Sequence, residues 1–187
     1  MIAKKCISRS VDFAKPLFYI VILTVGLYGC VHSPPSPERP LFSTGGKISI
    51  RQGTKGSSGR FSFEQYDTSI ALEVWGPLGQ GRTRLAGNEQ RLQLTQGDKT
   101  LAAGPAAELM QQQLGWYVPL NVFSAWLQGQ PHPDFPVDWR LQDSQQQRFV
   151  QLDWEVEFSR FGSAPEGQPG RISATKQGLR VLLVTRS

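Results

Sequence analysis

Alternation of apolar and polar residues is the feature that most restricts the folds open to this chain. Successive side chains of a β-strand point to opposite faces of a sheet, so a period of two predicts strands that bury one face. From Gly45 onward, segments with this pattern are separated by Gly, Asn and Asp at turn spacing. The segments are residues 47–51, 60–64, 70–74, 83–86, 91–95, 150–158, 171–174 and 179–184. They predict half-buried antiparallel strands that follow one another in a meander.

Two segments between these strand blocks have helical spacing instead. Apolar residues at 106, 109, 110 and 114 predict a helix that has Pro105 at its first position and Gly115 just past its end. A second short helix is expected from an N-cap at Asn121 to Gly129. The predicted fold is therefore mainly β (α+β). It consists of a long, strongly curved antiparallel sheet with short helices packed into its concave side.

The first 30 residues have the order of a secretion signal that ends on a cysteine. Four basic residues precede an apolar run at 17–27, which is followed by Tyr28, Gly29 and Cys30. The basic segment stays on the cytoplasmic side of a membrane while the apolar run enters the bilayer, so export is predicted. A single-pass anchor is the alternative. The run is, however, shorter than the roughly 20 residues that a spanning helix needs.

The Leu-x-Gly-Cys ending resembles the bacterial lipobox, in which the thiol receives a diacylglyceryl group and the peptide is cut before the cysteine. We therefore expect a signal peptide at 1–29, a lipidated Cys30 with a Pro-rich tether at 30–44, and one domain at 45–187. Val31 stands where Asp would signal retention in the inner membrane. This favours a lipid anchor in the outer membrane, with the domain facing the periplasm.

Charge and cysteine content exclude several classes of protein. Residues 1–29 hold four of the 20 Lys and Arg and one of the 15 Asp and Glu, so the remaining chain carries +2 rather than +5. Its charges are mixed along the sequence, which gives no support for nucleic-acid binding. Cys6 is lost with the signal and Cys30 is consumed by lipid, so neither a disulfide nor thiol chemistry is expected.

Residues for catalysis, nucleotide binding or metal binding do not assemble into a motif. His132 lies in a Pro-flanked loop, and no nucleophile motif accompanies it. The sequence contains no Walker-type loop, and its two histidines are too distant for a zinc site. Asp153, Glu155 and Glu157 alternate with apolar residues, as the solvent face of a strand would. We therefore predict no enzyme activity, no cofactor and no metal.

The segment from Trp75 to Gln80 places a leucine where it has no local partner. A predicted strand ends at Trp75, Gly76 and Pro77 turn the chain, and Leu78 is flanked by Pro77 and Gly79. An apolar side chain on a loop tip either folds back onto the core or is available for an interaction. The residues alone leave both possibilities open.

Besides the lipobox, the chain holds an ordered set of motifs: Gly46-Lys-Ile-Ser-Ile, Phe61-x-Phe, Gly76-Pro-Leu-Gly, Ala107-Glu-Leu, Leu114-Gly-Trp116, Val118-Pro-Leu120 and Trp126-Leu-Gln-Gly-Gln-Pro131. Together these motifs make the chain similar to the LolB family of outer-membrane lipoprotein receptors. The chain departs from many relatives at its end, Val184-Thr-Arg-Ser187, where a closing tryptophan is common.

The resemblance implies a fold, a function and a set of site residues. The fold would be an incomplete antiparallel β-barrel with helices forming a lid over an apolar cavity, and Trp116, Trp126 and Leu109 are candidates for its lining. The protein would accept acylated lipoproteins from a LolA-like periplasmic carrier and insert their acyl chains into the outer membrane. Leu78, with Pro77 and Gly79, would form the loop that contacts outer-membrane lipid. We expect a monomer.

The cost of exposing acyl chains explains why such a cargo requires an apolar relay. Three chains of about 15 methylenes, at about 0.8 kcal/mol per buried methylene, would cost about 36 kcal/mol to expose to water. Without a nucleotide site, transfer must run downhill in free energy from carrier to receptor to bilayer.

Two other classes of protein stay open at this stage. A structural or envelope-assembly lipoprotein with a filled core would share the signal and the strands but would bind no acyl chain. A lipid-modifying enzyme would depend on His132.

Overall fold

One continuous antiparallel sheet dominates the computed structural model, which describes residues 39–163 and 167–186. The predicted signal, Cys30 and most of the tether lie outside the described residues. Within that part of the chain, eleven strands are hydrogen-bonded in the order β6-β5-β4-β3-β2-β1-β11-β10-β9-β8-β7. Their bounds are β1 (Phe42–Gln52), β2 (Lys55–Gln65), β3 (Ile70–Trp75), β4 (Thr83–Gly87), β5 (Leu92–Gln96), β6 (Lys99–Gly104), β7 (Asp138–Gln142), β8 (Gln146–Gln151), β9 (Trp154–Ser159), β10 (Arg171–Lys176) and β11 (Leu179–Thr185).

The alternation in the sequence gives the sheet one buried face and one solvated face. In β1 and β2, Ile48, Phe61 and Phe63 are buried, whereas Lys47, just before Ile48, and Arg60, just before Phe61, are exposed. The buried faces of all the central strands contribute to a single hydrophobic core. The prediction of a mainly β fold with a curved antiparallel sheet is confirmed.

Pairing of β1 with β11 joins the first and last parts of this unit at the centre of the sheet. The two backbones approach closely at Gly46, where a Cβ atom would lie 2.0 Å from the carbonyl oxygen of Val184. Only glycine fits at such a contact. The sheet order ends at β6 on one side and β7 on the other, so the curved sheet stays open as a half-barrel.

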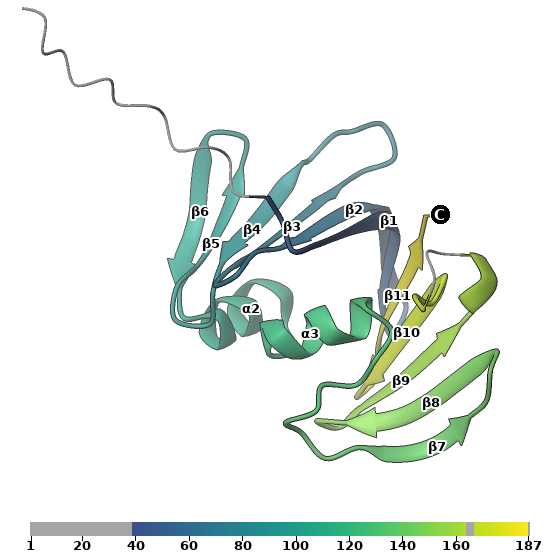
Figure 1. Cartoon of the computed structure of the whole chain (residues 1–187). Helices are drawn as coiled ribbons and strands as arrows, with labels where there is room; N and C mark the ends of the chain where they lie inside the picture. Colours follow the sequence, from purple (N-terminus) through teal and green to yellow (C-terminus); the bar gives the residue numbers. More distant parts are fainter. Residues whose placement is uncertain (1–38, 164–166, 187) are drawn as a thin grey trace, which may run out of the picture. The chain divides into compact units, whose positions relative to one another are not determined.

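Two helices lie on the concave side of the sheet, as Figure 1 shows: α2 (Ala106–Leu114) and α3 (Leu120–Leu127). A 3₁₀ turn, η1 (Phe161–Ser163), follows β9. Helix α2 ends at Gly115, as predicted, with a left-handed φ of 78°. Pro105, however, precedes the helix as its N-cap instead of occupying its first position.

The predicted N-cap of α3 is wrong, because Asn121 is the second residue of the helix and Pro119 precedes it. The side chain of Asn121 accepts a hydrogen bond only from the next backbone N–H, that of Val122, at 2.9 Å. Glu89, in the loop between β4 and β5, accepts the hydrogen bond from the N–H of Leu120 instead. A carboxylate from a distant loop thus satisfies an N–H group that a local cap usually satisfies.

The prediction of one strand over residues 150–158 is also wrong. The chain reverses at Leu152 and Asp153, whose φ values are 53° and 61°, and β8 then pairs with β9. Two-residue hairpins of this kind favour Asn and Gly, which tolerate positive φ. Leu152 is atypical at the first position of such a turn and no glycine is present, so the turn is hidden inside an alternating pattern. Asp153 lies in this turn, whereas Glu155 and Glu157 lie on β9.

The segment Arg39–Ser187 is a compact unit with a core of its own. Every residue of the core cluster lies between Ile48 and Leu183. The first strand begins at Phe42, which is three residues before the predicted start of the domain at residue 45 and five before the predicted strand at residue 47. A unit of this size with a complete core has what a domain needs to fold alone.

Candidate functional site

A small apolar cavity lies between the helical segment and the strands of the C-terminal half. The helical side consists of α3 and the loop before it, and the sheet side consists of β9, β10 and β11. Its lining is Trp116, Val118, Phe123, Trp126, Leu127, Trp154, Ile172, Ala174, Val181 and Leu183. The cavity volume is about 10 Å³, which is barely the space of one water molecule. The interior is therefore apolar and almost completely filled.

Aromatic side chains fill most of this space. The rings of Trp116 and Trp126 both meet Trp154 edge to face, with centroid distances of 5.7 Å and 6.2 Å. Trp126 and Trp154 are buried, whereas Trp116 is half-buried. Of the three candidates from the sequence, Trp116 and Trp126 line the cavity. Leu109 is buried in α2 but is not part of the lining.

A surface pocket of about 280 Å³ adjoins this cavity. Trp116 and Trp154 line both of them, and Lys176 and Gln52 contribute polar groups to the surface pocket. The half-buried indole of Trp116 therefore separates solvent from the apolar interior. The sequence did not reveal this pocket, because its lining comes from four separate segments.

A carboxylate from the loop between β4 and β5 fastens α3 at its beginning. The carboxylate of Glu89 accepts hydrogen bonds from the hydroxyl of Tyr117, at 2.9 Å, and from the N–H of Leu120. Burial of Tyr117 and its hydrogen bond to the charged Glu89 raise the pKa of Tyr117 to about 12. The phenol therefore stays protonated as a donor at neutral pH.

Two glutamines hold α3 to the sheet further along. Gln65 of β2 accepts hydrogen bonds from Ser124 and from Gln128, whose Nε2 atom lies at 3.0 Å. Gln151 of β8 is buried and accepts from the indole N–H of Trp126 at 3.0 Å. It also pairs with both backbone groups of His132, with N–H at 3.1 Å and C=O at 2.9 Å. His132 thus serves to bind the loop after α3 to the sheet.

Helix α2 is attached differently. In the part of the chain that the structure describes, no side-chain hydrogen bond joins α2 to a strand. Its contacts are Leu109, Met110 and Ala106, which are buried in the core, and the backbone bond from Ala106 N–H to the carbonyl of Glu89 at 2.9 Å. Helix α2 is therefore held mainly by apolar contacts, whereas α3 is also held by several side-chain hydrogen bonds.

The loop between β3 and β4 holds Leu78 out into solvent, where the residue is 93% exposed. Hydrogen bonds within the loop join the N–H of Gly76 to the carbonyl of Gln80 (2.8 Å) and the N–H of Gly79 to the carbonyl of Gly76 (2.9 Å). The N–H of Leu78 donates to Oε1 of Gln80 at 3.0 Å. Gly79 has a φ of 84°, which suits glycine. The loop is therefore shaped by its own bonds.

Charged residues brace the base of this loop. Arg82 lies over the ring of Trp75 at 4.6 Å and donates to Glu73 at 2.7 Å, and Arg84 donates to the other oxygen of Glu73 at 3.0 Å. Burial opposes the charged form of Glu73. The hydrogen bonds from Arg84 and Arg82 outweigh burial and hold the pKa of Glu73 below its usual value.

Metal ligands do not cluster in the part of the chain that the structure describes. No group of three His, Cys, Asp or Glu side chains comes together there in a way that could hold a metal ion. None of the helices there has the length and apolar character to cross a membrane.

The fold and these features define a class: an antiparallel half-barrel with helices over an apolar concave face and an apolar loop projecting from one end. Comparison with known families identifies a particular member of that class. The family model described as outer membrane lipoprotein LolB matches residues 41–187. The chain belongs to the LolB family.

Individual relatives agree with this assignment. The outer-membrane lipoprotein LolB of Chromohalobacter salexigens is 28% identical over 185 residues, covering 88% of this chain and 86% of the relative. The LolB protein of Pseudomonas aeruginosa strain PAO1 is 30% identical over 159 residues, covering 83% and 77%. Among solved structures, a LolA superfamily protein from Nitrosomonas europaea matches with a TM-score of 0.48 and 10% identity, covering 81% of this chain and 86% of that one.

Proposed function

We propose that this protein is an outer-membrane receptor that accepts acylated lipoproteins from a periplasmic LolA-like carrier and passes their acyl chains into the outer membrane. It acts as a monomer, is anchored through a lipidated Cys30, and faces the periplasm. It makes or breaks no covalent bond in the cargo. The observation that carries the proposal is the apolar interior between α3 and the sheet, together with membership of the LolB family.

The chemistry of the cavity lining fits an acyl chain. All ten lining residues are apolar, and they come from both the helical cover and the sheet. Such a lining binds methylene groups without directional contacts, so it does not distinguish cargo sequences. Because the cavity holds only about 10 Å³ in this structure, part of the helical cover must move before a chain can enter.

The attachments of the two helices suggest which part moves. Polar side chains of two strands and of the loop between β4 and β5 hold α3, whereas α2 depends on apolar contacts and one backbone bond. We propose that α2 and the Trp116 segment swing away while α3 stays in place. The acyl chain then enters from the surface pocket, past the indole of Trp116.

The Leu78 loop provides the step that follows uptake of the acyl chain, which is contact with the membrane. An exposed leucine on a loop with a fixed shape can enter the lipid interface without a change in the fold. We propose that Leu78, flanked by Pro77 and Gly79, contacts the outer membrane and brings the open receptor to the bilayer.

Uptake of a fluorescent fatty acid by residues 39–187 tests this proposal. Saturable uptake is expected, and Ala174→Phe should reduce it because the ring occupies the cavity, at a cost of about 1 to 3 kcal/mol in stability. Trp116→Ala should speed uptake, and this variant decides the question if Ala174→Phe does not fold. Glu155→Gln, on the solvated face of β9, is the matched control and should change uptake little.

A nearly filled cavity is also what a structural or envelope-assembly lipoprotein with a filled core would have. That alternative predicts no saturable uptake by the parent domain and no change in Trp116→Ala. Loss of uptake in Glu155→Gln with the fold intact would instead show that the solvated face of the sheet is the binding surface.

A further inference from the structure

Two cations lie directly opposite each other on neighbouring strands beside the Leu78 loop. The pairing of β1 with β2 places Lys47 against Arg60, and both are exposed on the solvated face. Like charges at directly opposite positions of an antiparallel pair destabilise the sheet. Within the described residues, neither side chain has an acidic partner within salt-bridge distance. The pair therefore leaves positive charge without a counterion from the described protein.

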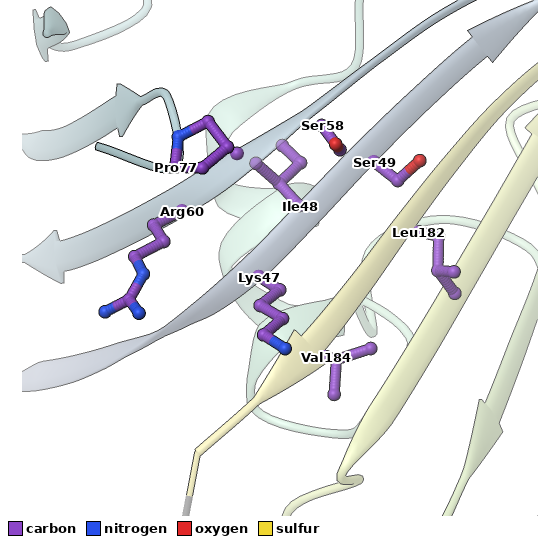
Figure 2. A pocket seen from close by; sticks show the side chains of 9 residues that line it. Lys47, Ile48, Ser49, Ser58, Arg60, Pro77, Leu182 and Val184 are labelled. Carbon is purple, nitrogen blue, oxygen red and sulfur yellow. The ribbon is translucent and has the colours of Figure 1, made fainter. Parts of the chain in front are cut away.

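The same two residues line a groove of about 500 Å³, here called the Lys47–Arg60 groove. Apolar side chains of Leu182 and Val184 on β11 form one part of its wall, and Pro77 of the Leu78 loop forms another. Figure 2 shows Lys47 and Arg60 extending from neighbouring strands, with Pro77 on the side of Arg60. The groove thus combines two cations with apolar surface, immediately next to the most exposed leucine of the domain.

We propose that the Lys47–Arg60 groove binds the phosphate of an anionic phospholipid headgroup while Leu78 lies in the bilayer. This inference depends on the membrane contact of Leu78 in the proposed function. The guanidinium of Arg60 can make a bidentate hydrogen-bonded pair with phosphate, and the ammonium of Lys47 adds a point charge. A bound phosphate would also relieve the repulsion between the two cations. Leu182, Val184 and Pro77 would contact the glycerol and the upper acyl carbons.

Binding of residues 39–187 to vesicles tests this assignment. Neutral phosphatidylcholine vesicles are compared with equimolar phosphatidylcholine and phosphatidylglycerol, and bound protein is measured by co-sedimentation over a lipid titration. The parent domain should prefer the anionic vesicles. The double variant Lys47→Gln and Arg60→Gln should lose roughly fivefold in affinity per cation on these vesicles, the value expected for about 1 kcal/mol per basic residue near an anionic surface.

A control variant that removes the same amount of charge elsewhere distinguishes the effect of this groove from the effect of net charge. Arg91→Gln with Lys99→Gln removes two exposed cations at the β5–β6 end of the sheet. This control should keep most of the preference for anionic vesicles. Equal losses in the two double variants would overturn the proposal, because net charge alone would then explain binding.

The Leu78→Glu variant distinguishes failure of this inference from failure of the proposed function. Binding of Leu78→Glu to both kinds of vesicle like the parent would refute the membrane contact of the loop. If Leu78→Glu instead loses affinity for both kinds of vesicle, while Lys47→Gln with Arg60→Gln loses no more affinity than the control double variant, only the headgroup site would be refuted.

Two further measurements exclude other sources of the anion. Saturable binding of inorganic phosphate to the domain without vesicles, abolished by Lys47→Gln with Arg60→Gln, would overturn the assignment to lipid; we expect no such binding. Cargo uptake from the carrier should be unchanged in the groove variant. Loss of uptake with vesicle binding intact would identify the groove as an acidic-protein surface and overturn the proposal.

Discussion

Replacing Leu78 by glutamate should block release of cargo into membranes without affecting the fold. The residue is 93% exposed, and the loop bond at this position uses its backbone N–H, so the free energy of unfolding should change by less than about 0.5 kcal/mol. Burying one leucine in lipid is worth about 1.5 to 3 kcal/mol, which corresponds to about 10- to 150-fold in membrane affinity. A glutamate at this position would lack this favourable free energy of burial, and its carboxylate would also be costly to desolvate.

A two-step assay separates uptake from release. Transfer of an acylated lipoprotein from the carrier to the receptor is scored first, and incorporation of the cargo into liposomes is scored second. Leu78→Glu should accept cargo normally and release it at least about tenfold more slowly. Leu101→Glu, on edge strand β6, is the control, since Leu101 is also exposed, at 52%. Release by Leu78→Glu at the parental rate would refute the reasoning, and unfolding of this variant would show that the leucine supports the structure.

Three further predictions concern other parts of the chain. Cys30→Ala should abolish lipidation and cleavage at the lipobox. An unmodified Cys30 in the parent protein, detected by mass spectrometry of membrane-derived material, would contradict this prediction. The pKa of Tyr117 is raised to about 12 from an ordinary value of 10, so its contribution to stability is complete below about pH 10 and is lost as pH rises towards 12. Tyr117→Phe should remove this alkaline loss, and an unchanged pH dependence of denaturant unfolding would argue against the hydrogen bond to Glu89. Gln151→Leu should leave the buried indole N–H of Trp126 without an acceptor, and each buried partner left unsatisfied should lower the free energy of unfolding by about 1 to 3 kcal/mol. An unchanged melting temperature would show that water replaces the amide.

The sequence predicted the central strands well because each buries one face. Their alternating patterns correspond to β1–β5 and β9–β11, where core and solvated residues occupy fixed positions. The two edge strands, β6 and β7, were missed. Their apolar residues Leu101, Trp139 and Leu141 are exposed, so burial imposes little pattern there. Most of β8 was missed as well, and its last two residues were merged with β9 into one predicted strand over 150–158.

Features that depend on distant residues could not be predicted. The turn at Leu152 and Asp153 adopts positive φ without Gly or Asn, and the cap of α3 comes from Glu89, 31 positions before Leu120. The cavity lining was predicted only for Trp116 and Trp126, because β10 and β11 meet the helical segment through tertiary contacts. The residues left the exposure of Leu78 open, because a leucine on a loop tip can fold back onto the core. The structure holds it in solvent through hydrogen bonds within the loop, which join Gly76, Leu78 and Gln80.

Transfer of a lipoprotein from its periplasmic carrier to residues 39–187 tests the central claim most directly. Carrier loaded with acylated cargo is mixed with the domain, and the cargo that co-purifies with each protein is measured, with the same cargo lacking its acyl chains as the control. The account predicts that acylated cargo moves to the domain and that unacylated cargo does not. Acylated cargo that stays with the carrier, or unacylated cargo that moves equally well, would contradict it.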